Sequence, residues 1–181
     1  MTDATPTTYP EVGHTRRGPL PAGYRHMRHR TRLGAGDAVF AVAAQAVLSW
    51  RMHRAMRVGI DPSAPRADAG VTVVTRPGVG PLRLTAPCVV VWAEDGPERA
   101  GFGYGTTAGH PFSGEEAFVV TRDADGSVWL DVVSFSRPAQ PWVRLAGPAA
   151  PWFQRAYAAW CGVTLRRLLK HAAPAPGEAA A

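Results

Sequence analysis

Glycine occupies every second position from residue 101 to 105, and this alternation constrains the fold more than any other feature of the sequence. Side chains of a strand alternate between its two faces, so the glycines share one face, while Phe102, Tyr104 and Thr106 share the other. Glycine weakens a strand and offers no side chain for packing. We therefore expect a helix, a bend or a ligand to come close to the glycine face.

A polar turn follows this strand. The chain turns through Gly109-His110-Pro111, and Glu115 and Glu116 lead into a second strand. Imidazole titrates near neutral pH and a neighbouring carboxylate can orient it, so this cluster suits a general acid or base. Only Glu116 shares a face with Phe118, because neighbours on a strand point opposite ways. The alternative is that the histidine serves only the geometry of the turn.

The composition is that of one globular domain. The chain has 181 residues, of which 46% are hydrophobic and 19% are charged, and a chain of this length can bury a sizeable core. We expect a flexible tail over residues 1–8, a single domain over 9–171 and a disordered Ala/Pro tail over 172–181. The first ten residues are polar, and the longest apolar run, residues 38–50, is too short to span a bilayer. These features predict a cytoplasmic protein without membrane insertion.

The net charge is +6, and nearly all of the basic residues are arginine. A basic balance can indicate nucleic-acid binding, but no nucleic-acid motif accompanies the charge, so we do not expect such a partner. An anion or RNA site is kept as an alternative, and it would use Arg16, Arg17, Arg28, Arg30 and Arg32. The six histidines lack metal-ligand spacing, and there is no dinucleotide fingerprint. We therefore expect neither a metal nor a cofactor.

Periodicity predicts the remaining elements. Helices are expected where apolar residues recur every three or four positions, over residues 38–56 and 152–171. Strands are expected where the period is two, over residues 24–33, 71–76, 82–93, 98–107, 115–122 and 127–137. Residues 60–69 and 139–151 are expected to be loops. This order predicts an α+β fold, in which a curved antiparallel sheet of about six strands wraps on a long C-terminal helix.

The element order resembles the helix-grip fold of the START/Bet v 1-like superfamily, in which the space between sheet and helix commonly holds an apolar ligand. Short motifs point to a narrower group. They are Tyr9-Pro-Glu-Val-Gly13, Gly34-Ala-Gly36 followed by Phe40 and Trp50, Gly101-Phe-Gly-Tyr-Gly-Thr106, Gly109-His-Pro111, Ser113-Gly-Glu-Glu-Ala-Phe118 and Ser136-Arg-Pro-Ala139. Over about residues 9–170 the chain resembles the bacterial and plant family catalogued as domain of unknown function nineteen-ninety. The resemblance implies no established activity.

The last expected strand has a mixed face and a largely apolar one. Trp129, Asp131, Val133, Phe135 and Arg137 share the mixed face. If that face looks at the C-terminal helix, Asp131 and Arg137 would form a polar pair at the edge of a cavity, because a buried charge needs a partner. If it looks outward, both side chains are solvated.

The sequence favours a binding module for a small apolar molecule. Its pocket, between the sheet and the C-terminal helix, would be lined by Trp50, Phe102, Tyr104, Trp129, Asp131, Phe135, Tyr157 and Trp160. The same aromatic residues could instead fill a solid core. An enzyme is the alternative class of protein, with His110 as general acid or base, assisted by Glu116 and Arg137. None of these features specifies an oligomeric state.

Overall fold

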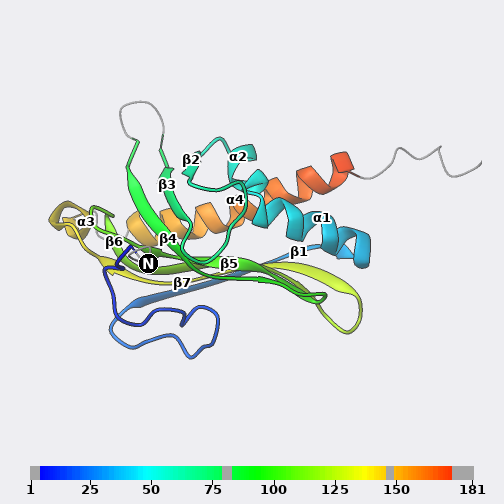
Figure 1. Ribbon diagram of the computed structural model, residues 1–181, viewed down its shortest axis with the longest axis horizontal. Coiled ribbons are helices and arrows are strands. Elements are labelled where there is room, and N and C mark those ends of the chain that lie inside the picture. The colour runs from blue at the N-terminus through cyan, green and yellow to red at the C-terminus, as the bar shows by residue number, and fades with distance from the viewer. Residues whose placement is uncertain (1–4, 79–82, 146–148, 173–181) are drawn as a thin grey trace, which may run out of the picture.

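The computed structural model describes residues 5–78, 83–145 and 149–172, which form one antiparallel sheet with helices on one face (Figure 1). The seven strands of this part are β1 (Arg25–Ala35), β2 (Gly59–Pro62), β3 (Thr72–Arg76), β4 (Ala86–Asp95), β5 (Arg99–Thr106), β6 (Phe112–Arg122) and β7 (Ser127–Pro138). Its helices are α1 (Asp37–Leu48), α2 (Arg51–Ala55), α3 (Pro141–Leu145) and α4 (Ala149–Ala172). The strand order is β1-β7-β6-β5-β4-β3-β2.

The two faces of the sheet are covered by different parts of the chain. On the inner face, α4 packs against β1 and α1, and α1 packs against β5 and β6. Gly162 marks the close crossing of α4 and β1, because a Cβ at this glycine would lie 2.5 Å from the Thr31 hydroxyl. The outer face is covered in part by the N-terminal segment, residues 5–24, which runs below the sheet in Figure 1.

The predicted α+β class, with an antiparallel sheet and a long C-terminal helix, is confirmed. The sheet has one strand more than expected, because Gly59–Pro62, at the start of the expected loop 60–69, pairs with β3. The single helix expected over residues 38–56 is wrong. Trp50 adopts a left-handed backbone with φ of 64°, which separates α1 from α2. The expected loop 139–151 contains α3 and the beginning of α4.

The two predicted tails fall only partly within the described residues. Thr8 belongs to the tail expected over residues 1–8. It donates its main-chain N–H to the carbonyl of Thr106 at 2.9 Å, so this residue is bound to the sheet. The tail expected over 172–181 lies outside the described residues, except that α4 continues to Ala172. Within the described ranges, no helix is both long and apolar enough to cross a membrane.

Candidate functional site

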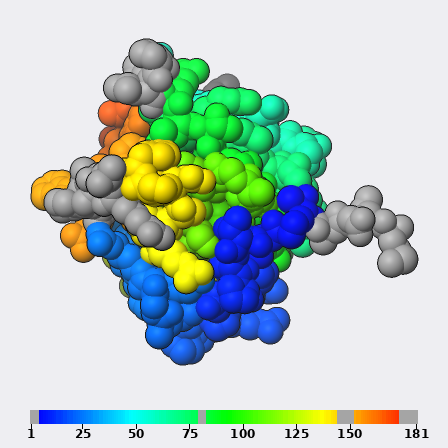
Figure 2. Space-filling model, turned by 90° about the vertical axis from the view of Figure 1, so that its left-hand side faces the viewer, coloured from blue at the N-terminus to red at the C-terminus, as the bar shows by residue number. Residues whose placement is uncertain are grey.

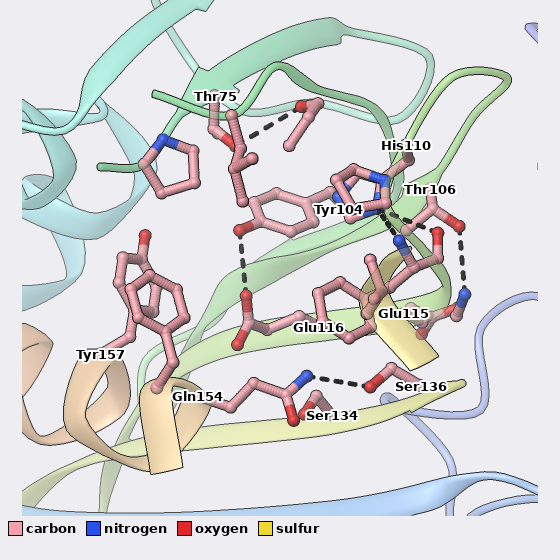
Figure 3. Close-up of a pocket in the computed structure, with 18 of the residues that line it drawn as sticks. Thr75, Tyr104, Thr106, His110, Glu115, Glu116, Ser134, Ser136, Gln154 and Tyr157 are labelled. Carbon is pink, nitrogen blue, oxygen red and sulfur yellow. Dashed lines mark hydrogen bonds between the residues drawn. The ribbon is translucent and has the colours of Figure 1, made fainter. Parts of the chain in front are cut away.

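A cavity of about 300 Å³ lies at one end of the sheet, between the inner face of β5–β7 and the first turns of α4 (Figure 3). Its apolar and aromatic lining includes Val58, Pro77, Leu84, Ala86, Pro111, Phe112, Trp142, Val143, Phe153 and Tyr157. Its polar lining includes Thr75, Tyr104, Thr106, His110, Glu116, Ser134, Ser136 and Gln154. Figure 2 looks onto this end of the molecule, where the end of β7 and α3 (yellow) lie beside the N-terminal segment (blue).

Three polar side chains form a row across the sheet on the floor of the cavity. Tyr104 of β5 is paired across the ladder with Glu116 of β6, and Glu116 is paired with Ser134 of β7. Directly paired residues lie on the same face of a sheet, and all three line the cavity. Ser134 is 3% exposed, and its hydroxyl has no hydrogen-bond partner among the described residues. This floor triad gives the cavity one carboxyl group flanked by two hydroxyl groups.

Glu116 is a carboxyl group in largely apolar surroundings. The Tyr104 hydroxyl donates to Glu116 Oε2 at 3.0 Å (Figure 3). Burial raises the pKa of Glu116 to about 7, although the hydrogen bond from Tyr104 lowers it. Burial and the nearby Glu116 carboxylate raise the pKa of the Tyr104 phenol well above its usual range. Near neutral pH, Glu116 can therefore release or accept a proton, which suits general acid–base chemistry.

His110 lines the same cavity, but its ring is engaged by the turn. Its Nδ1 accepts the main-chain N–H of Phe112 at 2.9 Å, and burial lowers the pKa of the imidazole to about 4. At neutral pH the ring is therefore uncharged, and one of its nitrogens is already occupied. His110 therefore both stabilises the turn and lines the cavity. Of the two groups, Glu116 has the pKa closer to neutrality.

Glu115 points to the outer face of the sheet, where the N-terminal segment binds it. Its Oε2 accepts the Tyr9 hydroxyl at 2.8 Å and the Gly13 main-chain N–H at 2.7 Å. Its Oε1 accepts the main-chain N–H of Thr15 at 3.0 Å, the Thr15 hydroxyl, and the Trp92 indole N–H at 3.3 Å. The side chain is 2% exposed. This carboxylate therefore anchors the N-terminal segment to the sheet.

The glycine face of β5 allows that segment to approach. A Cβ at Gly105 would lie 2.2 Å from Tyr9 Oη, and a Cβ at Gly103 would lie 2.3 Å from Trp92 Nε1. Real Cβ atoms do not come this close to such neighbours. The close approach expected from the alternating glycines is therefore made at these two positions by aromatic side chains on the outer face.

The mixed face of β7 looks away from α4. Val128, Leu130 and Val132, on the opposite face of this strand, are fully buried in the core between sheet and helices. Burial of apolar surface favours this orientation, because it removes three large apolar side chains from water. Asp131 and Arg137 therefore do not form a polar pair at the edge of the cavity.

The residues on the mixed face have other partners. Asp131 Oδ1 lies 3.4 Å from Arg30 Nε, and the Arg30 guanidinium lies over the ring of Trp129. The Arg137 guanidinium lies over the ring of Tyr24, outside the cavity lining. The structure therefore separates Arg137 from His110 and Glu116, the two other predicted catalytic residues.

The remaining predicted ligand-binding residues divide among cavity, core and surface. Tyr157 lines the cavity beside the floor triad (Figure 3). Trp50 and Phe102 are fully buried, with 4.8 Å between their ring centroids, so they form part of the solid core. Phe135 is buried on the outer face beneath the N-terminal segment. Trp160 is 46% exposed on α4 and does not line the cavity.

Sequence reasoning missed several lining residues. Ser134 follows Val132 on the inner face of β7, so the period of two could have placed it there once the buried face was known. Trp142 lies in a segment that was expected to be a loop. Gln154 donates its side-chain N–H to Ser136 Oγ at 2.9 Å across the cavity wall, and no sequence signal indicated this contact.

The arginines of the alternative anion site are partly neutralised. Arg16 lies 3.4 Å from a carboxylate oxygen of Glu94, and Arg30 lies 2.9 Å from one of Asp123. Among the residues that the structure describes, there is no group of three or more His, Cys, Asp or Glu side chains placed to hold a metal ion.

An antiparallel sheet around a long C-terminal helix, with a cavity between them, defines the helix-grip, Bet v 1-like class. Norcoclaurine synthase from Thalictrum flavum, solved in complex with dopamine and hydroxybenzaldehyde, matches with a TM-score of 0.58 and 9% identity over 84% of this chain and 90% of that chain. Ginseng major latex-like protein 151 from Panax ginseng matches with a TM-score of 0.55 and 14% identity over 83% of this chain and 99% of that chain. These likenesses show the fold alone.

The sequence itself places the chain within a family. The family model described as Domain of unknown function (DUF1990) matches residues 8–164. A UPF0548 protein of Deinococcus radiodurans is 37% identical over 158 residues, which cover 82% of this chain and 80% of that relative. This chain belongs to the DUF1990 family, and the family predicted from its short motifs is confirmed.

Proposed function

We propose that this chain is a binding domain for a small, mostly apolar molecule, which it holds in the cavity between the sheet and α4. The observation that carries the proposal is the cavity, about 300 Å³ of largely apolar space with a polar floor. Burial of ~200 Å² of apolar ligand surface contributes about 5 kcal/mol at ~25 cal/mol per Å², before the cost of association is subtracted. The complex of norcoclaurine synthase with two small aromatic molecules supports the proposal, because that protein shares the fold.

The proposal is tested by blocking the cavity from within. Ser134→Phe places a ring on the cavity floor, where the native side chain is small. Val133→Phe is the matched control, because it adds a ring to the same strand on the outer face. N-phenyl-1-naphthylamine, an uncharged dye whose fluorescence rises in apolar sites, is titrated into each protein, and thermal melts verify that each variant is folded.

We expect saturable binding of one dye molecule to the wild type and to Val133→Phe, and at least ~10-fold weaker binding to Ser134→Phe, because the added ring occupies the site. Equal dye binding by all three proteins, or no saturable binding by the wild type, contradicts the proposal. Native mass spectrometry of the freshly purified protein measures the mass of any small molecule that co-purifies with it.

An enzyme is the second candidate, and one observation favours it. Glu116 and His110 line the same cavity, and burial holds the pKa of Glu116 at about 7. A general base is most effective when its pKa lies near the working pH. In an enzyme, Glu116 is therefore a better base than His110, whose Nδ1 is occupied. Glu116→Gln would then abolish turnover of the bound molecule, although an uncharged dye would still bind in the cavity. A cytoplasmic location stays a prediction from the sequence.

A further inference from the structure

Among the residues that the structure describes, the cavity contains a carboxyl group without a cationic partner. None of the described residues that line it is lysine or arginine. Glu115 also borders the cavity, but its carboxylate is bound by the N-terminal segment on the outer face. Glu116 therefore supplies the carboxyl group that faces the cavity. An ionised carboxyl in apolar surroundings is costly unless a positive charge accompanies it.

The described groups packed around Glu116 do not supply this positive charge. They are Tyr104 of β5, His110 of the turn, Cys88 of β4, and Tyr157 and Cys161 of α4. Phenols and thiols are either neutral or negative, and burial raises the pKa of both thiols and both phenols. Burial also lowers the pKa of the His110 imidazole to about 4, so it is uncharged at neutral pH.

A second observation points to a ligand at the same place. The Ser134 hydroxyl is buried beside Glu116, lines the cavity and has no partner among the described residues. A buried polar atom without a partner costs free energy that a bound ligand can recover by donating a hydrogen bond. The Glu116 carboxylate and the Ser134 hydroxyl are therefore adjacent acceptors that line the same cavity. Within the described part of the chain, the Tyr104 hydroxyl donates to Glu116, and no group donates to Ser134.

We propose that the molecule held in this cavity is an amphipathic amine, whose ammonium group binds at the floor triad and whose apolar remainder fills the cavity. This inference rests on the proposed function. An ammonium group carries several N–H donors, of which one can bond to the Glu116 carboxylate and another to Ser134 Oγ. A carboxylate or phosphate ligand would instead meet the like charge of ionised Glu116, and a neutral ligand would leave the ionised form without a counter-charge.

The inference predicts how affinity depends on pH. A protonated amine binds the ionised form of Glu116, and the pKa of Glu116 in the free protein is about 7. Raising the pH from 5.5 to 8.0 increases the ionised fraction, so amine affinity rises up to about 30-fold. An aliphatic amine remains protonated over this range, since its pKa is about 10. A neutral ligand of the same shape shows no such rise.

The test compares 4-phenylbutylamine, 4-phenylbutanol and 4-phenylbutyrate as competitors of N-phenyl-1-naphthylamine at pH 5.5 and 8.0. For the wild type at pH 8.0 we expect the amine to bind at least ~10-fold more tightly than the alcohol, and the acid to bind most weakly. Glu116→Gln keeps the shape of the side chain and should remove both the preference for the amine and its pH dependence. Glu98→Gln, at an exposed carboxylate outside the cavity lining, is the control for the loss of one negative charge.

The outcomes separate the inference from the proposed function. Equal competition by amine and alcohol, failure of the amine to compete, or an amine preference that survives in Glu116→Gln overturns the inference, while binding of the dye itself upholds the proposed function. Absence of dye binding to the wild type overturns both. The pH profile of the wild type decides the matter even if Glu116→Gln does not fold, because a flat amine profile is incompatible with pairing to Glu116.

Discussion

Glu115 and Glu116 are neighbours on one strand, yet they face two different environments. On the outer face, Glu115 accepts hydrogen bonds from four residues of the N-terminal segment and β4. On the inner face, Glu116 accepts one from Tyr104 and borders a cavity. The chain segment that covers each face of the sheet therefore decides what a carboxyl group on that face can do. One is saturated and structural, while the other keeps the capacity to bind or react.

The alternation of side chains on β5 creates this difference. Gly103 and Gly105 leave the outer face open, so that Trp92 and Tyr9 can reach the carboxylate of Glu115. Between these glycines, Tyr104 occupies the inner face and supplies the donor to Glu116. The outer surface is closed by the N-terminal segment, whereas the inner surface keeps open space between the sheet and the first turns of α4.

The largest effect is expected from Glu115→Gln. Both oxygens of Glu115 accept a main-chain N–H, one from Gly13 and one from Thr15. The amide –NH₂ of glutamine would meet a main-chain donor in either orientation. We expect a loss of about 3 kcal/mol or more in the free energy of unfolding, measured by chemical denaturation. A loss below about 1 kcal/mol would show that the N-terminal segment does not depend on this anchor.

Glu116→Gln should change the free energy of unfolding in the opposite direction, because it should stabilise the protein as the pH rises. The pKa of Glu116 is about 7 in the folded protein, above its ordinary value of 4.5. The folded state therefore holds more protons than the unfolded state between these values, and stability decreases as the pH rises through this window. Relative to the wild type, Glu116→Gln should gain about 3 kcal/mol between pH 4 and pH 8. Denaturation curves of both proteins at the two pH values measure this difference, and a parallel pH dependence would contradict it.

The smallest effects come from the two tyrosines that donate to these carboxyl groups. Tyr9→Phe removes a donor from the saturated carboxylate and should cost about 2 kcal/mol, as expected for a hydrogen bond to a charged group. Tyr104→Phe removes the donor to Glu116, and at pH 6, where that carboxyl is largely protonated, it should cost about 1 kcal/mol or less. Thermal and chemical denaturation at pH 6 compare the pair, and the reverse order would contradict the assignment of the two faces.

Much of this site was predictable from local alternation. The period of two placed Tyr104 opposite the glycines, and it placed Glu116 on a different face from Glu115. The fold class followed from the order of the elements, and the family followed from short motifs that include Tyr9 and Gly13. These features depend on neighbours in the sequence, so they can be deduced without knowledge of the packing.

The rest depends on contacts between distant segments. Both faces of β7 carry apolar residues, so the sequence did not decide which one packs on the helices, and Ser134 was missed as a result. The break between α1 and α2 lies at Trp50, whose ring is buried against Phe102, and no local propensity indicates this break. Trp142 lines the cavity from α3, within a proline-rich segment that the sequence predicts to be a loop. Nothing in the alternating glycines specified that Tyr9 would cross them.

The most direct test of the central claim is the titration of Glu116 by carbon-13 NMR of its side-chain carboxyl group, assigned by comparison with Glu116→Gln. The claim is that this carboxyl group lies in a largely apolar cavity in which none of the described lining residues is a cationic partner. It predicts a pKa of about 7 in the ligand-free protein. A titration midpoint near the ordinary value of 4.5 would show that Glu116 is solvated like a surface carboxylate, and would contradict the claim.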